Sequence, residues 1–182
     1  GGGEGSGGGT RQVAGVGKVC WRPCNAGIAG TAECVDVGVM ELDKLAAVAK
    51  SHEVDLVVVG PDDPLAAGAV DVLEAAGLRV FGPRKAAAVL EASKAFSKEL
   101  MKKYGIPTAA YETFHRPEDA LEYVKTAKLP IVLKADGLAL GKGVLICRPR
   151  EEAGEGVRTL MADKQFGAAG DTSVAEEVMT GR

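Results

Sequence analysis

The chain has 182 residues, of which 46% are hydrophobic, so it is long enough for one ordinary domain or two small ones. Its 22 basic and 25 acidic residues are interspersed and leave a net charge of −3, which argues against a nucleic-acid partner. The sequence contains neither an apolar run of about 20 residues nor a recognisable secretory signal, so we expect a cytoplasmic protein without a membrane partner.

The first part of the chain differs in character from the rest. Residues 1–24 begin with seven glycines among nine and show no sustained helix or strand pattern, so we expect an irregular, disordered start. The four cysteines, at positions 20, 24, 34 and 147, lack the paired spacing of a zinc site. We therefore expect reduced thiols and no metal ligand in this chain.

Residues 25–88 predict a partial Rossmann-like domain. We expect a buried strand at residues 54–60, a helix at 64–76 that stops at Gly77, and a second strand at 78–82. This order predicts a parallel pair of strands joined by a right-handed crossover. Such a unit is the building block of an open, doubly wound sheet.

The turn formed by Gly60, Pro61, Asp62 and Pro64 follows the first of these strands. Ligands of doubly wound sheets bind beyond the carboxyl ends of the strands, where backbone N–H groups and a helix N-terminus can meet an anionic group. Two prolines and a glycine also make a rigid turn that binds nothing. Position alone leaves these two interpretations open.

A second helix is expected over residues 83–104, ending at Gly105 and bridging two domains. We place the bridging helix and its linker at residues 89–111, because Gly105 and Pro107 interrupt the helical pattern. Residues 112–182 are expected to form a small α+β module. Its strand candidates are residues 109–114, 130–136, 143–147 and 172–178, and its helices begin near Pro117 and Pro149.

The glycine-rich stretch after the second of these strand candidates carries the clearest chemistry. Lys134 ends an apolar strand, and Gly137, Gly141 and Gly143 follow it. Backbone N–H groups of such a loop, with Lys134 and Lys142, can bind the phosphates of a nucleotide triphosphate. A strand follows this loop where a P-loop needs a helix, so we expect a hairpin flap that covers the phosphates. An exposed hairpin turn with flexible glycines is the alternative.

Six segments give the sequence a specific likeness, namely VGPDDPL, VFGP, LEASKAFSKELMKKYGIPTA, IVLKADGLALGKGV, FGAAGD and VAEEVMTG. In this order and at these intervals they resemble the glycinamide ribonucleotide synthetase family of the ATP-grasp superfamily, from about Asn25 to Arg182. The resemblance implies an α/β fold. In it, a partial doubly wound parallel sheet, the pre-ATP-grasp domain, precedes the first, small α+β part of an ATP-grasp domain.

The resemblance also implies a reaction. ATP phosphorylates the carboxylate of glycine, and the amine of 5-phosphoribosylamine attacks the glycyl phosphate, a step of de novo purine biosynthesis. A carboxylate is a poor electrophile, so it needs a phosphate leaving group, and cationic side chains with Mg²⁺ neutralise the charge during transfer. No residue of this chain is identified as catalytic. A non-catalytic module for adenine nucleotides and another ATP-grasp carboxylate–amine ligase remain alternatives.

The resemblance implies that Lys94 contacts the nucleotide phosphates, although its spacing alone fits a solvated surface lysine. Lys98 lies one turn further along the same helical face and fits either a surface ion pair or the nucleotide cleft. At the other end of the module, Glu176 is implied near the exocyclic amine of adenine, with the backbone of Val178 and Met179 along the base edge. The neighbouring Glu177 should face away, because side chains alternate along a strand.

Asn25 and Gly27, together with Gly60, Pro61 and Asp62, resemble the family's surface for the ribose phosphate. Asp62 stands where glutamate is more usual, so we expect its shorter side chain to reach a hydroxyl poorly or only through water.

The chain departs from the family at both ends. The family's first strand and its Arg-Glu-His-Ala helix have no counterpart here, so we expect an unpaired, apolar sheet edge. The sequence stops before the family's ribose-contacting glutamate and acidic Mg²⁺ ligands, which are expected beyond Arg182. We therefore expect a piece truncated at both ends that does not turn over by itself.

Overall fold

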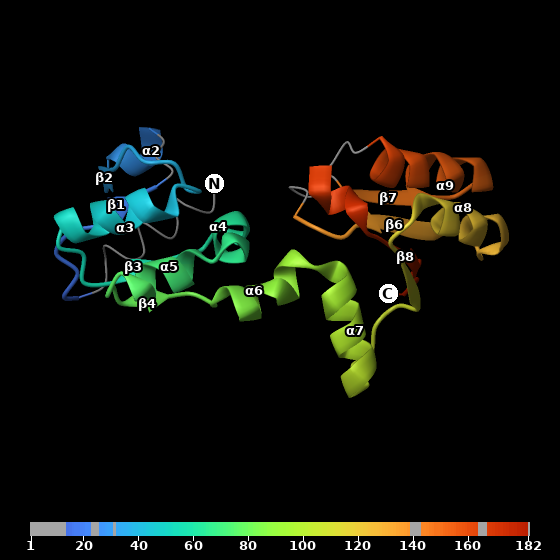
Figure 1. Ribbon diagram of the computed structural model, residues 1–182, viewed down its shortest axis with the longest axis horizontal. Coiled ribbons are helices and arrows are strands. Elements are labelled where there is room, and N and C mark those ends of the chain that lie inside the picture. Colours follow the sequence, from blue (N-terminus) through green and yellow to red (C-terminus); the bar gives the residue numbers. More distant parts are fainter. Residues whose placement is uncertain (1–13, 23–25, 31, 139–142, 164–166, 182) are drawn as a thin grey trace. The chain divides into compact units, whose positions relative to one another are not determined.

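The computed structural model describes residues 14–22, 26–30, 32–138, 143–163 and 167–181, and Figure 1 shows their helices and strands. The chain divides into two compact units, Gly1–Lys85 and Ala86–Arg182. Three of the residues that sequence reasoning places in binding sites, Asn25, Gly141 and Lys142, lie outside the described residues. Most of the expected irregular start lies outside them as well.

In the described residues, the first unit has two pairs of short parallel strands. These are β1 (Cys20–Trp21) with β2 (Glu33–Cys34), and β3 (Val57–Val58) with β4 (Val80–Phe81). Its helices are α2 (Ala26–Ala29), α3 (Leu42–Ser51), α4 (Asp62–Ala67) and α5 (Ala69–Ala75). The order β3, α4, α5, β4 confirms the predicted strand–helix–strand unit with parallel strands. The expectation that the first of these strands is buried is wrong, because Val58 on β3 is 62% exposed.

The helix predicted over residues 64–76 is two helices, because Gly68 interrupts it. Gly68 has a φ of 94°, a left-handed conformation that ends α4 and begins α5. On either side of the break, Leu65, Val70 and Leu73 are buried, so both helices still contribute an apolar face to the core of this unit. The hydrophobic pattern therefore predicted the packing correctly and missed the interruption.

The helix predicted over residues 83–104 is also divided. Its parts are α6 (Lys85–Ala92) and α7 (Lys94–Tyr104), and Ser93 between them is extended, with φ −129° and ψ 113°. The Ser93 hydroxyl accepts a hydrogen bond from the N–H of Phe96 and so caps α7. At the other end, Gly105 is left-handed with a φ of 65°, which confirms it as the residue where this helical segment stops.

The second unit is built on a four-stranded antiparallel sheet with the order β5, β8, β6, β7. The strands are β5 (Tyr111–Phe114), β6 (Ile131–Ala135), β7 (Val144–Cys147) and β8 (Ser173–Glu177). Helices α8 (Pro117–Thr126) and α9 (Arg150–Val157) begin at or beside the predicted prolines, and the π-helix η1 (Arg158–Ala162) and 3₁₀ helix η2 (Gly167–Asp171) follow α9. All four strand candidates are confirmed.

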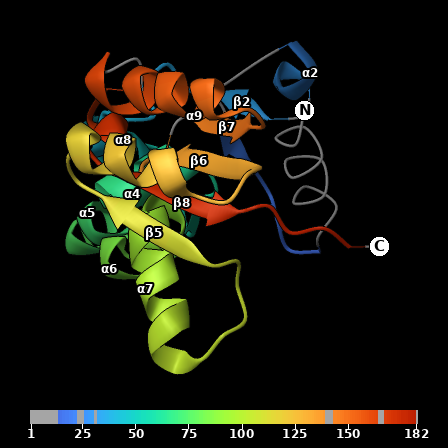
Figure 2. The same cartoon turned by 90° about the vertical axis from the view of Figure 1, so that its right-hand side faces the viewer.

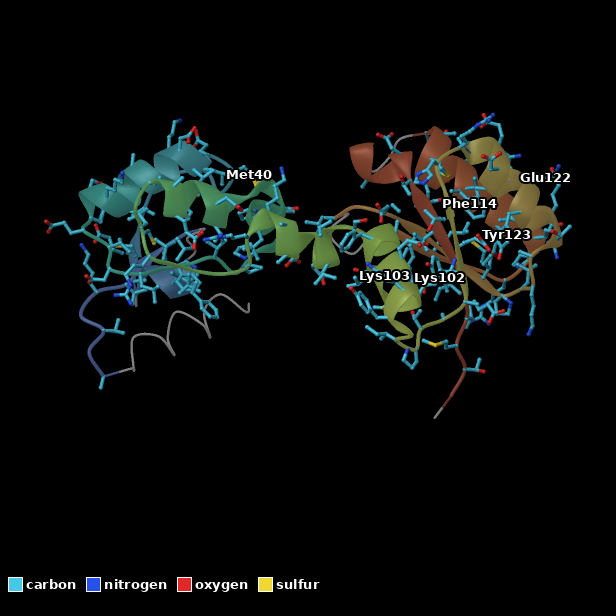
Figure 3. The ribbon with its side chains drawn as sticks, turned by 60° about the horizontal axis from the view of Figure 1, so that its bottom comes forward. Met40, Lys102, Lys103, Phe114, Glu122 and Tyr123 are labelled. Carbon is cyan, nitrogen blue, oxygen red and sulfur yellow. The ribbon has the colours of Figure 1, made fainter. Side chains whose placement is uncertain are left out.

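The core of the second unit lies between one face of the sheet and the helices α8, α9 and η1. Figure 2 shows α8 and α9 beside the strands. Leu133 on β6 and Ala175 on β8 are buried against these helices. At the margin of this core, Phe114 and Tyr123 pack with ring centroids 5.1 Å apart (Figure 3). Side chains alternate along each strand, so residues adjacent to Leu133 and Ala175 face the opposite side of the sheet.

Cysteine chemistry departs from the expectation of reduced thiols. Cys34 is disulfide-bonded, whereas Cys20 and Cys147 are free. Cys147 is buried on β7, and burial raises the pKa of its thiol. Among the helices in the described ranges, none is long and apolar enough to cross a membrane.

Candidate nucleotide-binding site

The candidate site begins with two strands whose register brings Lys134 and Glu176 together. In the β6–β8 pair, Lys134 lies opposite Val174 and Val132 lies opposite Glu176. Lys134 and Glu176 are therefore diagonal neighbours on the sheet face that does not carry Leu133. The Lys134 Nζ lies 2.8 Å from Glu176 Oε1, so the two strands place an ion pair there.

A second lysine reaches the same carboxylate from α7. Lys98 Nζ lies 3.1 Å from Glu176 Oε2 and donates a hydrogen bond of 2.7 Å to Thr108 Oγ1. It also donates to the carbonyl of Ala109 at 3.4 Å and lies 5.5 Å from the ring centroid of Tyr111. Because Lys98 is buried, its interpretation as one partner of a surface ion pair is wrong.

Glu176 is consequently a buried carboxylate between two ammonium groups. Its side chain is 8% exposed, compared with 10% for Lys98 and 26% for Lys134. Oε1 of Glu176 lies 2.8 Å from the Lys134 ammonium and has no other donor among the described residues. A carboxylate oxygen has two lone pairs, so Oε1 can accept a further donor. Two lysines against one glutamate leave an excess of positive charge, which favours an anionic ligand.

Lys94 is held at the beginning of the glycine-rich loop. Its Nζ donates a 3.0 Å hydrogen bond to the carbonyl of Gly137, which follows β6 after one residue. The intervening Asp136 accepts hydrogen bonds from the N–H of Ala95 at 2.6 Å and from the hydroxyl of Ser93. The first turn of α7 and the start of the loop are thereby joined. Lys94 is partly buried in this arrangement.

The two described glycines of the loop, Gly137 and Gly143, have different structural roles. A Cβ on Gly137 would lie 2.6 Å from the Cβ of Ala169 in η2, so this position requires glycine for close packing. Its expected role in the approach to phosphate stays a prediction. Gly143 is buried, and its carbonyl accepts a 2.8 Å hydrogen bond from the N–H of Ala135, which begins the β6–β7 ladder. Gly141 and Lys142 lie outside the described residues.

The residues expected along the base edge lie at and after the end of β8. The strand ends at Glu177, which is exposed while Glu176 is buried, in agreement with the predicted alternation. Val178 and Met179 follow the last residue of β8, so their backbone groups lie outside the sheet ladder. Val178 is half-buried and Met179 is 76% exposed. Whether they contact a base stays a prediction.

The residues expected to bind the ribose phosphate belong to the first unit. Gly27 lies in α2, Gly60 and Pro61 lie between β3 and α4, and Asp62 is the first residue of α4. All four are exposed. Pro61 is extended, with φ −71° and ψ 143°, and serves as the N-cap residue of α4 without a side-chain hydrogen bond to it. These positions are compatible with the predicted turn, and their ligand stays a prediction.

Two residues of the site carried no recognised functional signal in the sequence. The sequence patterns place Asp136 only at the end of a strand and Ser93 in the interior of a continuous helix. The structure instead joins them through hydrogen bonds of 3.0 and 3.2 Å between the serine hydroxyl and the two carboxylate oxygens. A serine whose hydroxyl can cap the N–H three residues later is a known signal for the start of a helix. The break at Ser93 could therefore have been predicted from the sequence.

The fold defines an α/β protein of the ATP-grasp class, in which a partial doubly wound domain precedes the start of the ATP-grasp domain. The model of the phosphoribosylglycinamide synthetase N domain matches residues 9–91, and that of the phosphoribosylglycinamide synthetase ATP-grasp (A) domain matches residues 92–182. The chain belongs to the phosphoribosylglycinamide synthetase family.

Relatives and a solved structure agree with this assignment. The chain is 45% identical over 167 residues to a phosphoribosylamine–glycine ligase of Caldanaerobacter subterraneus, covering 92% of this chain and 40% of the relative. It is 46% identical over 166 residues to that of Yersinia pestis, covering 90% and 39%. The crystal structure of the Thermotoga maritima enzyme aligns with a TM-score of 0.71 and 32% identity over 91% of this chain and 39% of that one. The chain thus spans about 40% of the length of these proteins.

The chemistry of the site fits ATP better than it fits a metal. The excess positive charge at Lys98 and Lys134 suits a polyphosphate, and the open acceptor on Glu176 suits the amino group of adenine. In the described part of the chain, no group of three or more His, Cys, Asp or Glu residues could hold a metal ion.

Proposed function

We propose that this chain provides the N domain and the nucleotide-binding part of an ATP-dependent ligase that joins glycine to 5-phosphoribosylamine through a glycyl phosphate. The family of the chain and the names of its relatives support the reaction. The observation that carries the nucleotide part is the Lys98–Glu176–Lys134 cluster beside the start of the glycine-rich loop.

In this proposal the residues of the second unit bind and orient ATP. Lys134, the more exposed of the two clustered lysines, turns its ammonium to the phosphates, and Lys94 approaches them from the first turn of α7. Glu176 accepts a hydrogen bond from the adenine amine through Oε1. The backbone at Val178 and Met179 completes the edge of the base pocket.

Bound ATP would supply the phosphoryl group that turns the glycine carboxylate into an acyl phosphate. The contribution of this chain is electrostatic and geometric, since phosphoryl transfer depends mainly on positioning and charge neutralisation. The loop between β6 and β7, with Gly137, Gly141, Lys142 and Gly143, would cover the phosphates and exclude water.

The first unit would bind the phosphorylated sugar amine. Its exposed turn at Gly60, Pro61 and Asp62 follows β3 at the carboxyl end of a parallel strand, where ligands of doubly wound sheets bind. Asn25 and Gly27 belong to the same proposal. Asp62 would then reach the ribose directly or through a water molecule.

Calorimetric titration of the chain with ATP, with and without Mg²⁺, tests the nucleotide part of the proposal. We expect ATP to bind, and Lys134→Met to weaken binding by about tenfold or more, because a charge-assisted contact to phosphate is lost. Lys128→Met serves as the matched control, since Lys128 is exposed. Tighter binding of a dinucleotide such as NAD than of ATP would instead support a Rossmann-type binding module.

The ligase part requires an activity measurement. Residues 92–182 can replace the corresponding segment of the Yersinia pestis relative, to which the chain is 46% identical. We expect this chimaera to release phosphate from ATP only when glycine and phosphoribosylamine are both present. Equal release with a different amine or carboxylate would favour another carboxylate–amine ligase of the same fold.

A further inference from the structure

Lys98 differs from the other lysines of the site because it is the most buried and three protein acceptors surround its ammonium group. Its Nζ lies 3.1 Å from Glu176 Oε2 and donates hydrogen bonds of 2.7 Å to Thr108 Oγ1 and 3.4 Å to the carbonyl of Ala109. The Tyr111 ring lies beside the same ammonium at 5.5 Å. An ammonium has three donors, so these acceptors leave Lys98 none for a ligand.

Lys134 shares Glu176 but has a different environment. Its side chain is 26% exposed, compared with 10% for Lys98, and it contacts Glu176 through the ion pair of 2.8 Å with Oε1. Because Lys134 is partly open to solvent, its ammonium group can also reach an anionic ligand. If it does, Glu176 is still neutralised by Lys98, whereas without Lys98 the buried carboxylate would retain Lys134.

We infer that Lys98 is a positioning residue for base selection. It fixes the Glu176 carboxylate in one rotamer and keeps Oε1 directed to the adenine amine while Lys134 contacts the phosphates. The inference rests on the proposed function, because it assumes that Glu176 lies at the adenine amine. It adds that the preference for a 6-amino over a 6-oxo purine depends on a lysine that does not touch the nucleotide.

The ratio of ATP affinity to inosine triphosphate affinity tests this role. The two nucleotides carry the same ribose and triphosphate, so changes in phosphate binding cancel in the ratio, while the 6-oxo group of inosine triphosphate offers Glu176 no donor. Both affinities would be measured by calorimetry on the whole 182-residue chain and on Lys98→Met, which keeps the length and apolar stem of the side chain. Lys102→Met is the control, because Lys102 lies one turn along α7, 6.0 Å from the same Tyr111 ring (Figure 3).

We expect the unaltered chain and Lys102→Met to prefer ATP, and Lys98→Met to lower that preference about tenfold, as expected for a lost hydrogen bond to a charged group. A folded Lys98→Met protein with an unchanged ratio would overturn the inference alone. An unaltered chain that binds both nucleotides equally would overturn it together with the adenine part of the proposed function.

A second variant keeps the test decisive if Lys98→Met does not fold, which a thermal melt would reveal. Thr108→Val removes one acceptor of the Lys98 ammonium at an exposed position, so it preserves both charges of the buried pair. We expect it to lower the preference for ATP by about threefold, a smaller effect than that of Lys98→Met, since the Lys98–Glu176 ion pair remains. An unchanged preference in the folded Thr108→Val chain would count against Lys98 as the residue that fixes Glu176.

Discussion

The carboxylate of Asp136 accepts a 2.6 Å hydrogen bond from the backbone N–H of Ala95, 41 residues earlier in the chain. Ala95 lies in the first turn of α7, where N–H groups have no partner within the helix. Asp136 therefore caps the helix from a loop, beside the local cap by Ser93. The N-terminus of α7 is occupied by a protein carboxylate and is not a free anion site.

Replacing Asp136 by alanine should destabilise the second unit. The N–H of Ala95 and the hydroxyl of Ser93 lose their acceptor, and the expected decrease in the free energy of unfolding is about 1–3 kcal/mol. Urea titration followed by tyrosine fluorescence measures this unit, because Tyr104, Tyr111 and Tyr123 all lie within it and the single tryptophan, Trp21, does not.

Asp163→Ala is the control for this prediction. Asp163 is an exposed aspartate of the same unit, so its removal should change the free energy of unfolding by less than about 0.5 kcal/mol. Equal stabilities of the Asp136→Ala and Asp163→Ala proteins would show that the cap contributes nothing.

Gly137 and Gly154 should respond to alanine with opposite signs. At Gly137 the added Cβ would lie 2.6 Å from the Cβ and 3.0 Å from the Cα of Ala169, so we expect overpacking to destabilise the unit by about 1–3 kcal/mol. At Gly154, inside α9, the nearest atom is Arg158 Nη1 at 3.9 Å. Alanine there should stabilise the helix by about 0.5–1 kcal/mol. Urea titration of both variants checks the signs, and stabilisation by Gly137→Ala would contradict the close packing.

Sequence patterns predicted the elements of the second unit well. Its strand candidates alternate apolar and polar residues or form short β-branched runs, and each is bounded by glycine, proline or a charged turn. The long helices were predicted less well, because Gly68 and Ser93 break them without interrupting the hydrophobic pattern on which the prediction rested. The disulfide at Cys34 was missed, since spacing alone does not show which cysteines meet.

The candidate site was only partly predictable for a different reason. Lys134 and Glu176 were singled out by the motifs that contain them, and strand register then brings them together. The sequence leaves the role of Lys98 undecided. The burial of Lys98 depends on how α7 packs on the sheet face opposite Leu133, which is a tertiary feature with no local signal. Spacing along the helix placed Lys98 on the same face as Lys94 and gave no information on its depth.

Tyr111 should make stability depend on pH in the alkaline range. Burial, and then the 2.7 Å hydrogen bond from its hydroxyl to Glu99, raise the pKa of Tyr111 from 10.0 to about 12. The folded state thus favours the neutral phenol, so its contribution is complete below pH 10.0 and is lost as the pH rises through about 12. The stability difference between the unaltered chain and Tyr111→Phe should shrink over this interval.

Urea titrations at several pH values measure that difference, and an absorbance titration of tyrosinate gives the pKa directly. The spectrum lost in Tyr111→Phe isolates this residue from Tyr104 and Tyr123. A Tyr111 transition at the ordinary value of 10.0 would contradict the prediction.

Glu176 and Lys98 should be strongly coupled in stability. Glu176→Gln leaves the Lys98 and Lys134 ammoniums without a counter-ion, and breaking a buried pair costs about 3 kcal/mol or more. Adding Lys98→Met removes the uncompensated buried charge. The double variant should therefore lose less stability than the two single variants lose together, by at least about 1 kcal/mol.

The exposed pair Lys125 and Glu122, with side chains 66% and 73% exposed, provides a control cycle expected to couple by less than about 0.5 kcal/mol. Urea titration followed by tyrosine fluorescence measures both cycles, and equal coupling energies would mean that burial does not strengthen the Lys98–Glu176 pair.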